Sequence, residues 1–383
     1  MEGPALSVIS DSHTLRLNDR AACVRIGATR GGGMGLKRYA LVTIVAAGVG
    51  VLSTGGASSA ADEAKKYYNR GMQQASQGKY EAAAESLRLA IEIRPKFPEA
   101  YHLLGIVFAN GQHRLTDAAD AFKKAIELNP SFAEAFYNLA LVYQIQGKSV
   151  EAEQELKKAL AIYPRYEEAL FALAQLYERQ QVYGSAVSTY AQLLSLRPDH
   201  QEALYALGYL NESQGKSHEA KELLTRLVKL RPDHADAHYL LGTIAEKANS
   251  LAEAEQEYKK AVAARPDFVD AHYNLGFILK SKGELEPAAQ EFKTTLKLKP
   301  DYADAYLNLG VVYALQHQFS EAEQAYEEAI RLKPTMAEAY YNLGVFYEFH
   351  MRDTERALAT YKKYLELGGT DERVQRIVRE AKG

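Results

Sequence analysis

Residues 301–334 read DYADAYLNLGVVYALQHQFSEAEQAYEEAIRLKP, and close copies of this stretch fill most of the chain. Seven of the copies end in a proline that lies 34 residues from the next: Pro130, Pro164, Pro198, Pro232, Pro266, Pro300 and Pro334. A fixed period of this length indicates one small supersecondary unit stacked many times, with neighbouring copies burying a shared core. We therefore expect most of the 383 residues to form one repeat array.

Each repeat is predicted to be a helical hairpin. With the proline as position 32, the repeats start at Ala64, Pro98, Ala133, Glu167, Gln201, Ala235, Val269, Ala303 and Ala337. Asp301, followed by Asp304 three residues later, is predicted to cap the first helix. A turn near position 15, often glycine, separates the two helices. The second and ninth repeats each contain one extra residue, which we place in that turn because helices tolerate insertions poorly.

The ends of the array differ from its middle. Position 3 is alanine and position 7 is leucine in every repeat after the first, and these positions share one helical face. In the first repeat, Lys66 and Arg70 make this face polar, as expected of a capping repeat at the start of an array. Residues 370–383 have an apolar stripe that predicts a C-terminal capping helix.

The repeat columns resemble the tetratricopeptide repeat. Position 8 is glycine or alanine, position 20 is alanine, position 24 is aromatic or leucine, and position 11 is often tyrosine, as in Tyr143 and Tyr313. The resemblance covers residues 64–369. It implies an all-α fold, a right-handed α-solenoid of nine TPR helical hairpins with a C-terminal capping helix.

The resemblance also implies that the first helices line a concave peptide-binding groove, through positions 2, 5, 6, 9, 12 and 13. Position 5 is mostly aromatic and position 6 is often asparagine, whose amide donates and accepts hydrogen bonds at once. We expect the aromatic side chains to be exposed, because these positions lie opposite the packed face of the helix. Exposed aromatic stripes mark interfaces. The candidate groove residues are Asn138, Asn274, Asn308, Asn342, Tyr137, Tyr205, Tyr239, Tyr273 and Tyr341. The alternative is that these residues are repeat consensus, with asparagine supporting the fold.

Charge on the groove and on the whole chain restricts the partners. Position 2 is acidic in eight repeats and position 12 adds Glu178, Glu212, Glu246 and Glu348, which favours neutral or basic ligand segments. The net charge of −3 argues against nucleic acid, which needs clustered lysine and arginine.

The N-terminal sixty residues are predicted to be a targeting region. Lys37 and Arg38 precede an apolar run and then small residues, the layout of a secretory signal peptide over residues 34–60, with cleavage after Ala60 or Ala61. The alternative is an uncleaved inner-membrane anchor formed by residues 39–52. Residues 1–33 are expected to be a disordered extension, or an untranslated stretch if Met34 is the true start.

Catalytic and metal chemistry find little support in the sequence. Cys23 is the single cysteine and lies outside the array, so the array forms no disulfide or thiolate site. His234 and His238 are four residues apart on one helix, but no third ligand accompanies them, so we expect no metal and no cofactor. No phosphate-binding loop or nucleophile motif stands apart from the repeat consensus.

These observations predict a non-enzymatic scaffold that binds peptide or helical segments of partner proteins in its concave groove. We expect it to be exported, to the periplasm or another extracytoplasmic compartment, with contact to a membrane only through an N-terminal anchor. The alternative is a membrane-anchored assembly factor or co-chaperone of an envelope complex.

Overall fold

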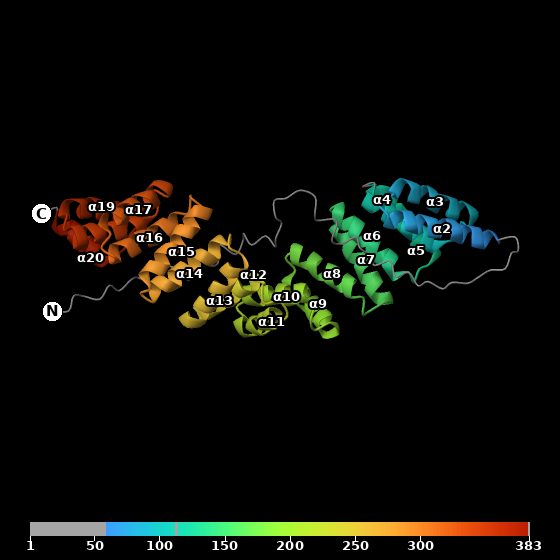
Figure 1. Cartoon of the computed structure of the whole chain (residues 1–383), viewed down its shortest axis with the longest axis horizontal. Helices are drawn as coiled ribbons and strands as arrows, with labels where there is room; N and C mark the ends of the chain where they lie inside the picture. The colour runs from blue at the N-terminus through green and yellow to red at the C-terminus, as the bar shows by residue number, and fades with distance from the viewer. Residues whose placement is uncertain (1–58, 112–113, 382–383) are drawn as a thin grey trace. The chain divides into compact units, whose positions relative to one another are not determined.

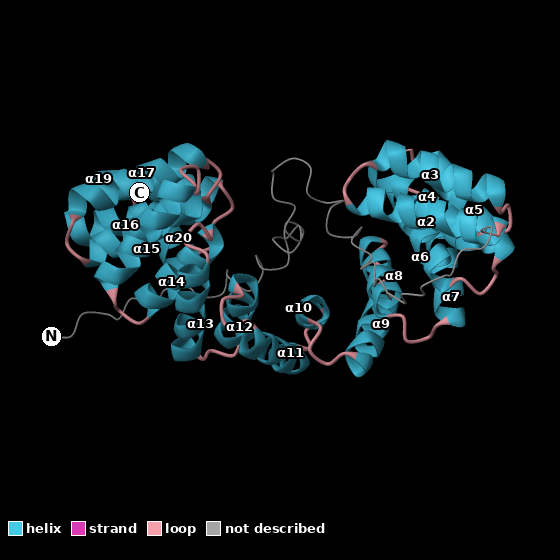
Figure 2. Cartoon of the chain, turned by 45° about the vertical axis from the view of Figure 1, so that its right-hand side comes forward, coloured by secondary structure: helices cyan, strands magenta, loops and turns pink. Residues whose placement is uncertain are grey.

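The computed structural model describes residues 59–111 and 114–381, and within these ranges it contains helices and no strands (Figure 2). The chain divides into an N-terminal unit, Met1–Pro198, and a C-terminal unit, Asp199–Gly383. The predicted extension 1–33 and nearly all of the predicted signal segment 34–60 lie outside the described residues. In the described ranges, no helix has the length and apolarity needed to cross a bilayer.

The N-terminal unit contains four helical hairpins in chain order (Figure 1). They are α2 (Ala60–Ser76) with α3 (Tyr80–Ile93), α4 (Pro98–Gly111) with α5 (Leu115–Leu128), α6 (Ala133–Ile145) with α7 (Ser149–Ile162), and α8 (Glu167–Arg179) with α9 (Tyr183–Leu196). Each second helix also packs against the first helix of the next hairpin, which makes a continuous stack within the unit.

The C-terminal unit contains five hairpins and one closing helix. They are α10 (Gln201–Ser213) with α11 (Ser217–Leu230), α12 (Ala235–Lys247) with α13 (Leu251–Ala264), α14 (Val269–Ser281) with α15 (Leu285–Leu298), α16 (Ala303–Leu315) with α17 (Phe319–Leu332), and α18 (Ala337–Val345), which continues into the π-helix η2 (Phe346–Met351), with α19 (Thr354–Glu366). The closing helix α20 (Glu372–Glu380) buries Val374 and Val378.

The predicted all-α solenoid of helical hairpins is confirmed. The first helices of the second to ninth hairpins begin at position 1 of their repeats, as α16 does at Ala303. Helix α2 begins earlier than predicted, at Ala60, because Ser59 and Asp62 form a capping box in front of it. The polar face predicted for the first repeat is exposed at Lys66 and Arg70.

The helix caps differ from the prediction by one residue. Asp301 lies in the turn, and the N-cap of α16 is Tyr302, whose side chain makes no capping hydrogen bond. In α12 the residue at the same position is His234, whose ring Nδ1 accepts a hydrogen bond from the backbone N–H of Ala237, 3.2 Å away. The turn that follows the proline is one residue longer than predicted. The N-cap is therefore the residue after the predicted one, Tyr302 in place of Asp301.

The turn between the two helices of a hairpin requires a left-handed backbone. Gly78 and Gly283 adopt φ values of 74° and 79° there. Gln181 and His317 occupy the same turn position without being glycine, at φ values of 60° and 61°. L-residues pay a steric cost in this region, so these turns hold strain that glycine would relieve.

The extra residue of the ninth repeat is absorbed inside a helix, so placing it in the turn was wrong for that repeat. The end of the first helix widens into the π-helix Phe346–Met351, and the turn residue Arg352 follows in the left-handed region. A π-helical turn takes in one additional residue without breaking the helix. The widened turn leaves Phe349 54% exposed.

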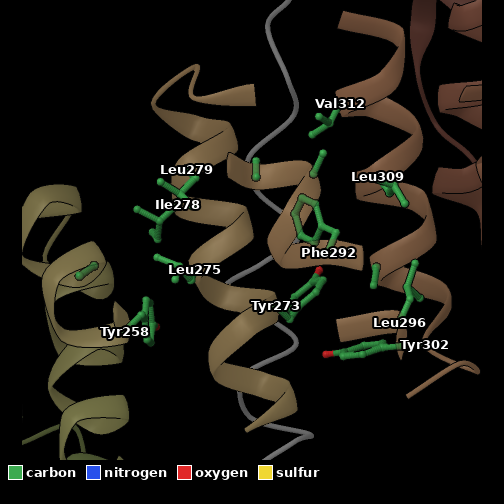
Figure 3. Packing of buried hydrophobic residues seen from close by; sticks show 14 of the residues in the cluster. Tyr258, Tyr273, Leu275, Ile278, Leu279, Phe292, Leu296, Tyr302, Leu309 and Val312 are labelled. Atoms are coloured by element: carbon green, nitrogen blue, oxygen red, sulfur yellow. The ribbon is translucent and has the colours of Figure 1, made fainter. Parts of the chain in front are cut away.

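The core joins each first helix to the buried side chain at position 24 of its own second helix, an aromatic ring or a leucine. In the C-terminal unit, Phe292 lies close to Tyr273 and Leu309, which come from the first helices on either side (Figure 3). Position 8 must be small here: a Cβ on Gly310 would stand 2.8 Å from the buried ring of Tyr326. A small residue at position 8 is therefore a packing requirement, and the close approach of the Tyr326 ring favours glycine at position 310.

Candidate functional site

The first-helix face, defined as positions 2, 5, 6, 9, 12 and 13 of the first helices, carries a hydrogen bond that links successive hairpins. In the C-terminal unit, the Nδ2 of Asn274 donates to the Tyr239 hydroxyl over 3.3 Å. The Nδ2 of Asn308 donates to the Tyr273 hydroxyl over 3.1 Å. Position 6 of one hairpin is thus bonded to position 5 of the hairpin before it.

The same link occurs in the N-terminal unit with a histidine in place of tyrosine. The Nδ2 of Asn138 lies 2.8 Å from the Nε2 of His102. Burial lowers the pKa of His102 to about 4, so at neutral pH the ring is uncharged and its nitrogen accepts this hydrogen bond. The asparagine column is therefore a structural link between hairpins in both units.

The expected exposure of the aromatic stripe is wrong for its best-packed members. Tyr137 and Tyr273 are only 6% and 3% exposed. Each position-5 ring packs on the position-34 ring that follows it: Tyr137 on Tyr166 at 5.2 Å, Tyr205 on His234 at 5.2 Å, Tyr239 on Phe268 at 4.9 Å and Tyr273 on Tyr302 at 4.9 Å between ring centroids. These rings hold neighbouring hairpins together, because the position-34 residue is the N-cap of the next first helix.

Tyr341 is the last of the position-5 aromatic residues, in the ninth repeat. Its partly buried ring lies 5.3 Å from the ring of Tyr364, between centroids. Tyr205 and Tyr239 are also partly buried. These rings are therefore only partly accessible to a partner, whereas the sequence predicted an exposed stripe.

Asn342 is the exception among the four candidate asparagines. The preceding position 5 is Leu307, which has no hydroxyl to accept a hydrogen bond. The Nδ2 of Asn342 donates only to the carbonyl oxygen of Glu338 in its own helix, over 2.8 Å. Its carboxamide oxygen and second N–H therefore remain available on a partly buried surface.

Glutamates at position 12 are held in place by buried tyrosines. The hydroxyls of Tyr190, Tyr258 and Tyr361 donate to Glu178, Glu246 and Glu348 over 3.0, 2.7 and 2.5 Å. Each tyrosine is at position 24 of the same hairpin. Glu178 is partly buried, and this burial raises the pKa of its carboxyl group.

Lys280 reverses the charge at position 12. Its hairpin has Phe292 at position 24, which cannot hold a carboxylate. The Lys280 Nζ instead donates to the Oδ1 of Asn308 over 2.6 Å and lies 4.6 Å from the centroid of the Phe277 ring. Burial lowers the pKa of Lys280 to about 8. Lys280 was not among the residues predicted for the groove, although a lysine in a column of glutamates is a signal that the sequence contains.

Apolar side chains surround these polar groups. Phe277, Val311 and Val345 occupy position 9 of α14, α16 and α18, and all three are partly buried. Leu315 and Phe349, at position 13, are 38% and 54% exposed. The first-helix face of the C-terminal unit therefore combines a free amide, one lysine and an apolar strip.

The two histidines with metal-ligand spacing are used in packing. His238 is 3% exposed, and its Nδ1 and Nε2 are hydrogen-bonded to Glu257 at 2.6 Å and to the carbonyl oxygen of Pro232 at 2.9 Å. His234 caps α12. No group of three metal-binding side chains occurs among the described residues.

Five family models of the tetratricopeptide repeat match the sequence. The matched stretches are 71–111, 121–154, 171–220, 212–268, 278–316, 303–336 and 337–367. No curated protein matches the chain.

Several solved structures are similar to the chain. PilF from Pseudomonas aeruginosa is 20% identical, with a TM-score of 0.47 over 54% of this chain and 95% of its own. A tetratricopeptide repeat protein from Parabacteroides merdae is 18% identical, with a TM-score of 0.45 over 74% and 97%. MamA from Desulfovibrio magneticus RS-1 is 26% identical, with a TM-score of 0.41 over 44% and 96%.

Proposed function

Because the chain belongs to the tetratricopeptide repeat family, we propose that it is a non-enzymatic scaffold that binds segments of partner proteins on its first-helix face. Proteins of this family generally bind other proteins. Almost all of the described chain consists of hairpins, and Leu307 and Lys280 depart from the repeat pattern on this face. We place the binding surface on α14, α16 and α18 of the C-terminal unit.

The single observation that carries this proposal is the free amide of Asn342. Asn138, Asn274 and Asn308 are each bonded to position 5 of the preceding hairpin, but Leu307 leaves Asn342 without that bond. The partly buried amide of Asn342 thus has a donor and an acceptor that a ligand can use. The peptide backbone supplies a matching C=O and N–H, so an extended segment of any sequence satisfies both.

The surroundings of Asn342 fit such a segment. Val311 and Val345 offer apolar contact beside the amide, and Phe349 lies exposed at the end of the same helix. A peptide that pairs its backbone with Asn342 would bury alternate side chains against this strip. Affinity then comes from apolar burial, and register comes from the amide.

A comparison of captured proteins tests the proposal. Wild-type chain, Asn342→Ala and the control Gln324→Ala, on the exposed side of α17, would each be used to capture proteins from the cells that produce the chain. Asn342→Ala removes only a bond within its own helix, so circular dichroism should show unchanged helicity. We expect a defined set of proteins with wild type and Gln324→Ala that is depleted at least about fivefold with Asn342→Ala. Equal capture by all three variants would count against the proposed surface.

We further propose that the chain acts outside the cytoplasm, on the strength of the signal-like layout of residues 34–60. Cleavage after Ala60 or Ala61 would remove Ser59, whose side chain caps α2, and would shorten that helix at its start. Mass measurement of the native N-terminus decides between processing and retention. A soluble species that begins near Asp62 supports export, and a membrane-bound species that retains residues 39–52 supports the anchored alternative.

A further inference from the structure

Lys280 is a cation that no carboxylate neutralises in the described part of the chain. Its Nζ has three N–H groups, and one of them donates to the Oδ1 of Asn308. Asn308 is itself fixed, because its Nδ2 donates to Tyr273 and to the carbonyl oxygen of Asp304. The neutral amide therefore orients the ammonium group but does not balance its charge.

Holding the charged Lys280 ammonium group without a counterion costs free energy, which indicates that a ligand supplies the counterion. Partial burial without a counterion disfavours the charged form of lysine, which lowers its pKa. The Phe277 ring under the Nζ gives only a weak electrostatic contact. A group that is oriented, partly desolvated and unpaired is well prepared to bind a carboxylate, because much of its ordering and desolvation cost is already met.

The neighbouring charges define what surrounds that carboxylate. Position 12 reads Glu212, Glu246, Lys280, Ala314 and Glu348 along successive first helices of the C-terminal unit. Glu348 is already paired with Arg373, whose Nη1 lies 2.8 Å from its Oε2, whereas Glu246 accepts a hydrogen bond from Tyr258 and has no cationic partner among the described residues. A ligand that places a negative charge at Lys280 therefore meets an unpaired acidic side chain on the Glu246 side. The complementary segment has one acidic residue with a basic residue on the side that faces Glu246.

We propose that Lys280 binds the side-chain carboxylate of a glutamate or aspartate that has a basic residue nearby in the same segment of a partner protein. This inference rests on the proposed function, since it assigns a ligand charge pattern to the same face. It also refines the expectation that acidic groove residues favour neutral or basic segments. The basic residue pairs with Glu246, and the acidic residue sets the register.

The expected spacing follows from the geometry of packed helices. Axes of packed helices are about 8–10 Å apart, and an extended chain advances about 3.3 Å per residue, so one hairpin corresponds to roughly three residues. The glutamate should therefore have a lysine or arginine about three residues away, on the side that faces Glu246. Two blocked peptides, one for each chain direction, have this pattern.

Fluorescence anisotropy with the full chain tests the inference. Each labelled peptide is compared with a version that has glutamine in place of glutamate, against wild type, Lys280→Met and the exposed control Lys297→Met on α15. We expect the glutamate peptide of one direction to bind wild type and Lys297→Met about tenfold more tightly than its glutamine version, with no such preference in Lys280→Met. With Lys280→Glu, a peptide with lysine in place of glutamate should become the preferred ligand.

Several results would overturn the inference. Equal affinities for the glutamate and glutamine peptides in both directions would do so, as would a preference that persists in Lys280→Met. No binding of any peptide at about 1 mM would also do so. If the cellular proteins captured through Asn342 are unaffected by Lys280→Met, the charge pattern is wrong and the binding face stands. Failure of both experiments would rule out the first-helix face as the binding surface.

Discussion

The side-chain amide of Asn308 donates a hydrogen bond to the hydroxyl of Tyr273, 3.1 Å away in the preceding hairpin. This bond repeats between Asn274 and Tyr239, but the following hairpin cannot form it because Leu307 replaces the tyrosine. One substitution in a structural ladder thus turns Asn342 from a link between hairpins into a surface amide. The proposed function depends on this difference.

Leu307→Tyr should restore the missing link and block the site. A hydroxyl at position 307 would accept the hydrogen bond of Asn342, as Tyr273 does for Asn308. We expect the C-terminal unit to gain about 1 kcal/mol in unfolding free energy and the captured partners to be depleted. Urea denaturation measures the first effect and quantitative mass spectrometry measures the second. Undiminished capture by a variant that is more stable would show that the free amide is not needed.

Lys280→Met should stabilise the protein while it abolishes the preference for acidic peptides. The substitution removes a partly buried charge and keeps the aliphatic stem, so we expect a gain of about 1 kcal/mol near neutral pH. The folded pKa of about 8 lies below that of an unfolded lysine. The penalty is therefore complete below pH 8, and it is relieved as the pH rises from 8 toward the unfolded value.

The pH dependence of the difference between the two proteins provides the check. Denaturation of wild type and Lys280→Met in parallel should show a stability difference that is largest at pH 7 and shrinks above pH 8. A difference of constant size across this range would mean that the gain comes from packing. Loss of stability in Lys280→Met would mean that the ammonium group supports the fold.

Gly310→Ala should destabilise the C-terminal unit by about 1–3 kcal/mol. A Cβ at this position would lie 2.8 Å from the Tyr326 ring, which is 2% exposed and cannot move aside without disturbing the core. The matched control is Gly184→Ala, where a Cβ would have no heavy atom within 4 Å. Helix propensity alone should then stabilise α9 by about 0.5–1 kcal/mol. Equal effects of the two substitutions in denaturation experiments would contradict this account of position 8.

Gln181→Gly should stabilise the hairpin formed by α8 and α9. Gln181 adopts a φ of 60° in an exposed turn, where four other hairpin turns in the described chain have glycine. Relief of the left-handed strain, less the entropy cost of glycine, should leave a net gain of about 0.5–1 kcal/mol. Hydrogen exchange in α8 and α9 should slow accordingly, and faster exchange would contradict the prediction.

The period of the sequence was enough to predict the fold. The 34-residue spacing and the small residues at positions 3, 8 and 20 predicted the hairpins and the starts of eight first helices, because packing between repeats restricts every copy alike. Local details were harder. The sequence did not reveal that position 34 caps the first helix or that the extra residue of the ninth repeat forms η2, since backbone geometry decides both.

The candidate site was only partly visible in the sequence. The pattern gave the Tyr and Asn columns as candidate groove residues of the first helices, but Tyr273 and Asn308 are buried and bonded to each other. Periodicity gives the side of a helix on which a residue lies, but not whether the next repeat covers it. Leu307 matters because it cannot accept a hydrogen bond from Asn342, and Lys280 matters because no carboxylate in the described residues pairs with it. Both facts become known only when the neighbouring side chains are located in three dimensions.

Site-specific crosslinking tests the central claim most directly. A photoreactive amino acid at Val345, one turn after Asn342, would be compared in the producing cells with the same group at Gln324 on α17. We expect Val345 to yield discrete protein adducts that disappear in the Leu307→Tyr background, and Gln324 to yield none of them. Adducts at Gln324 that match those at Val345, or Val345 adducts that persist with Leu307→Tyr, would contradict binding at the first-helix face.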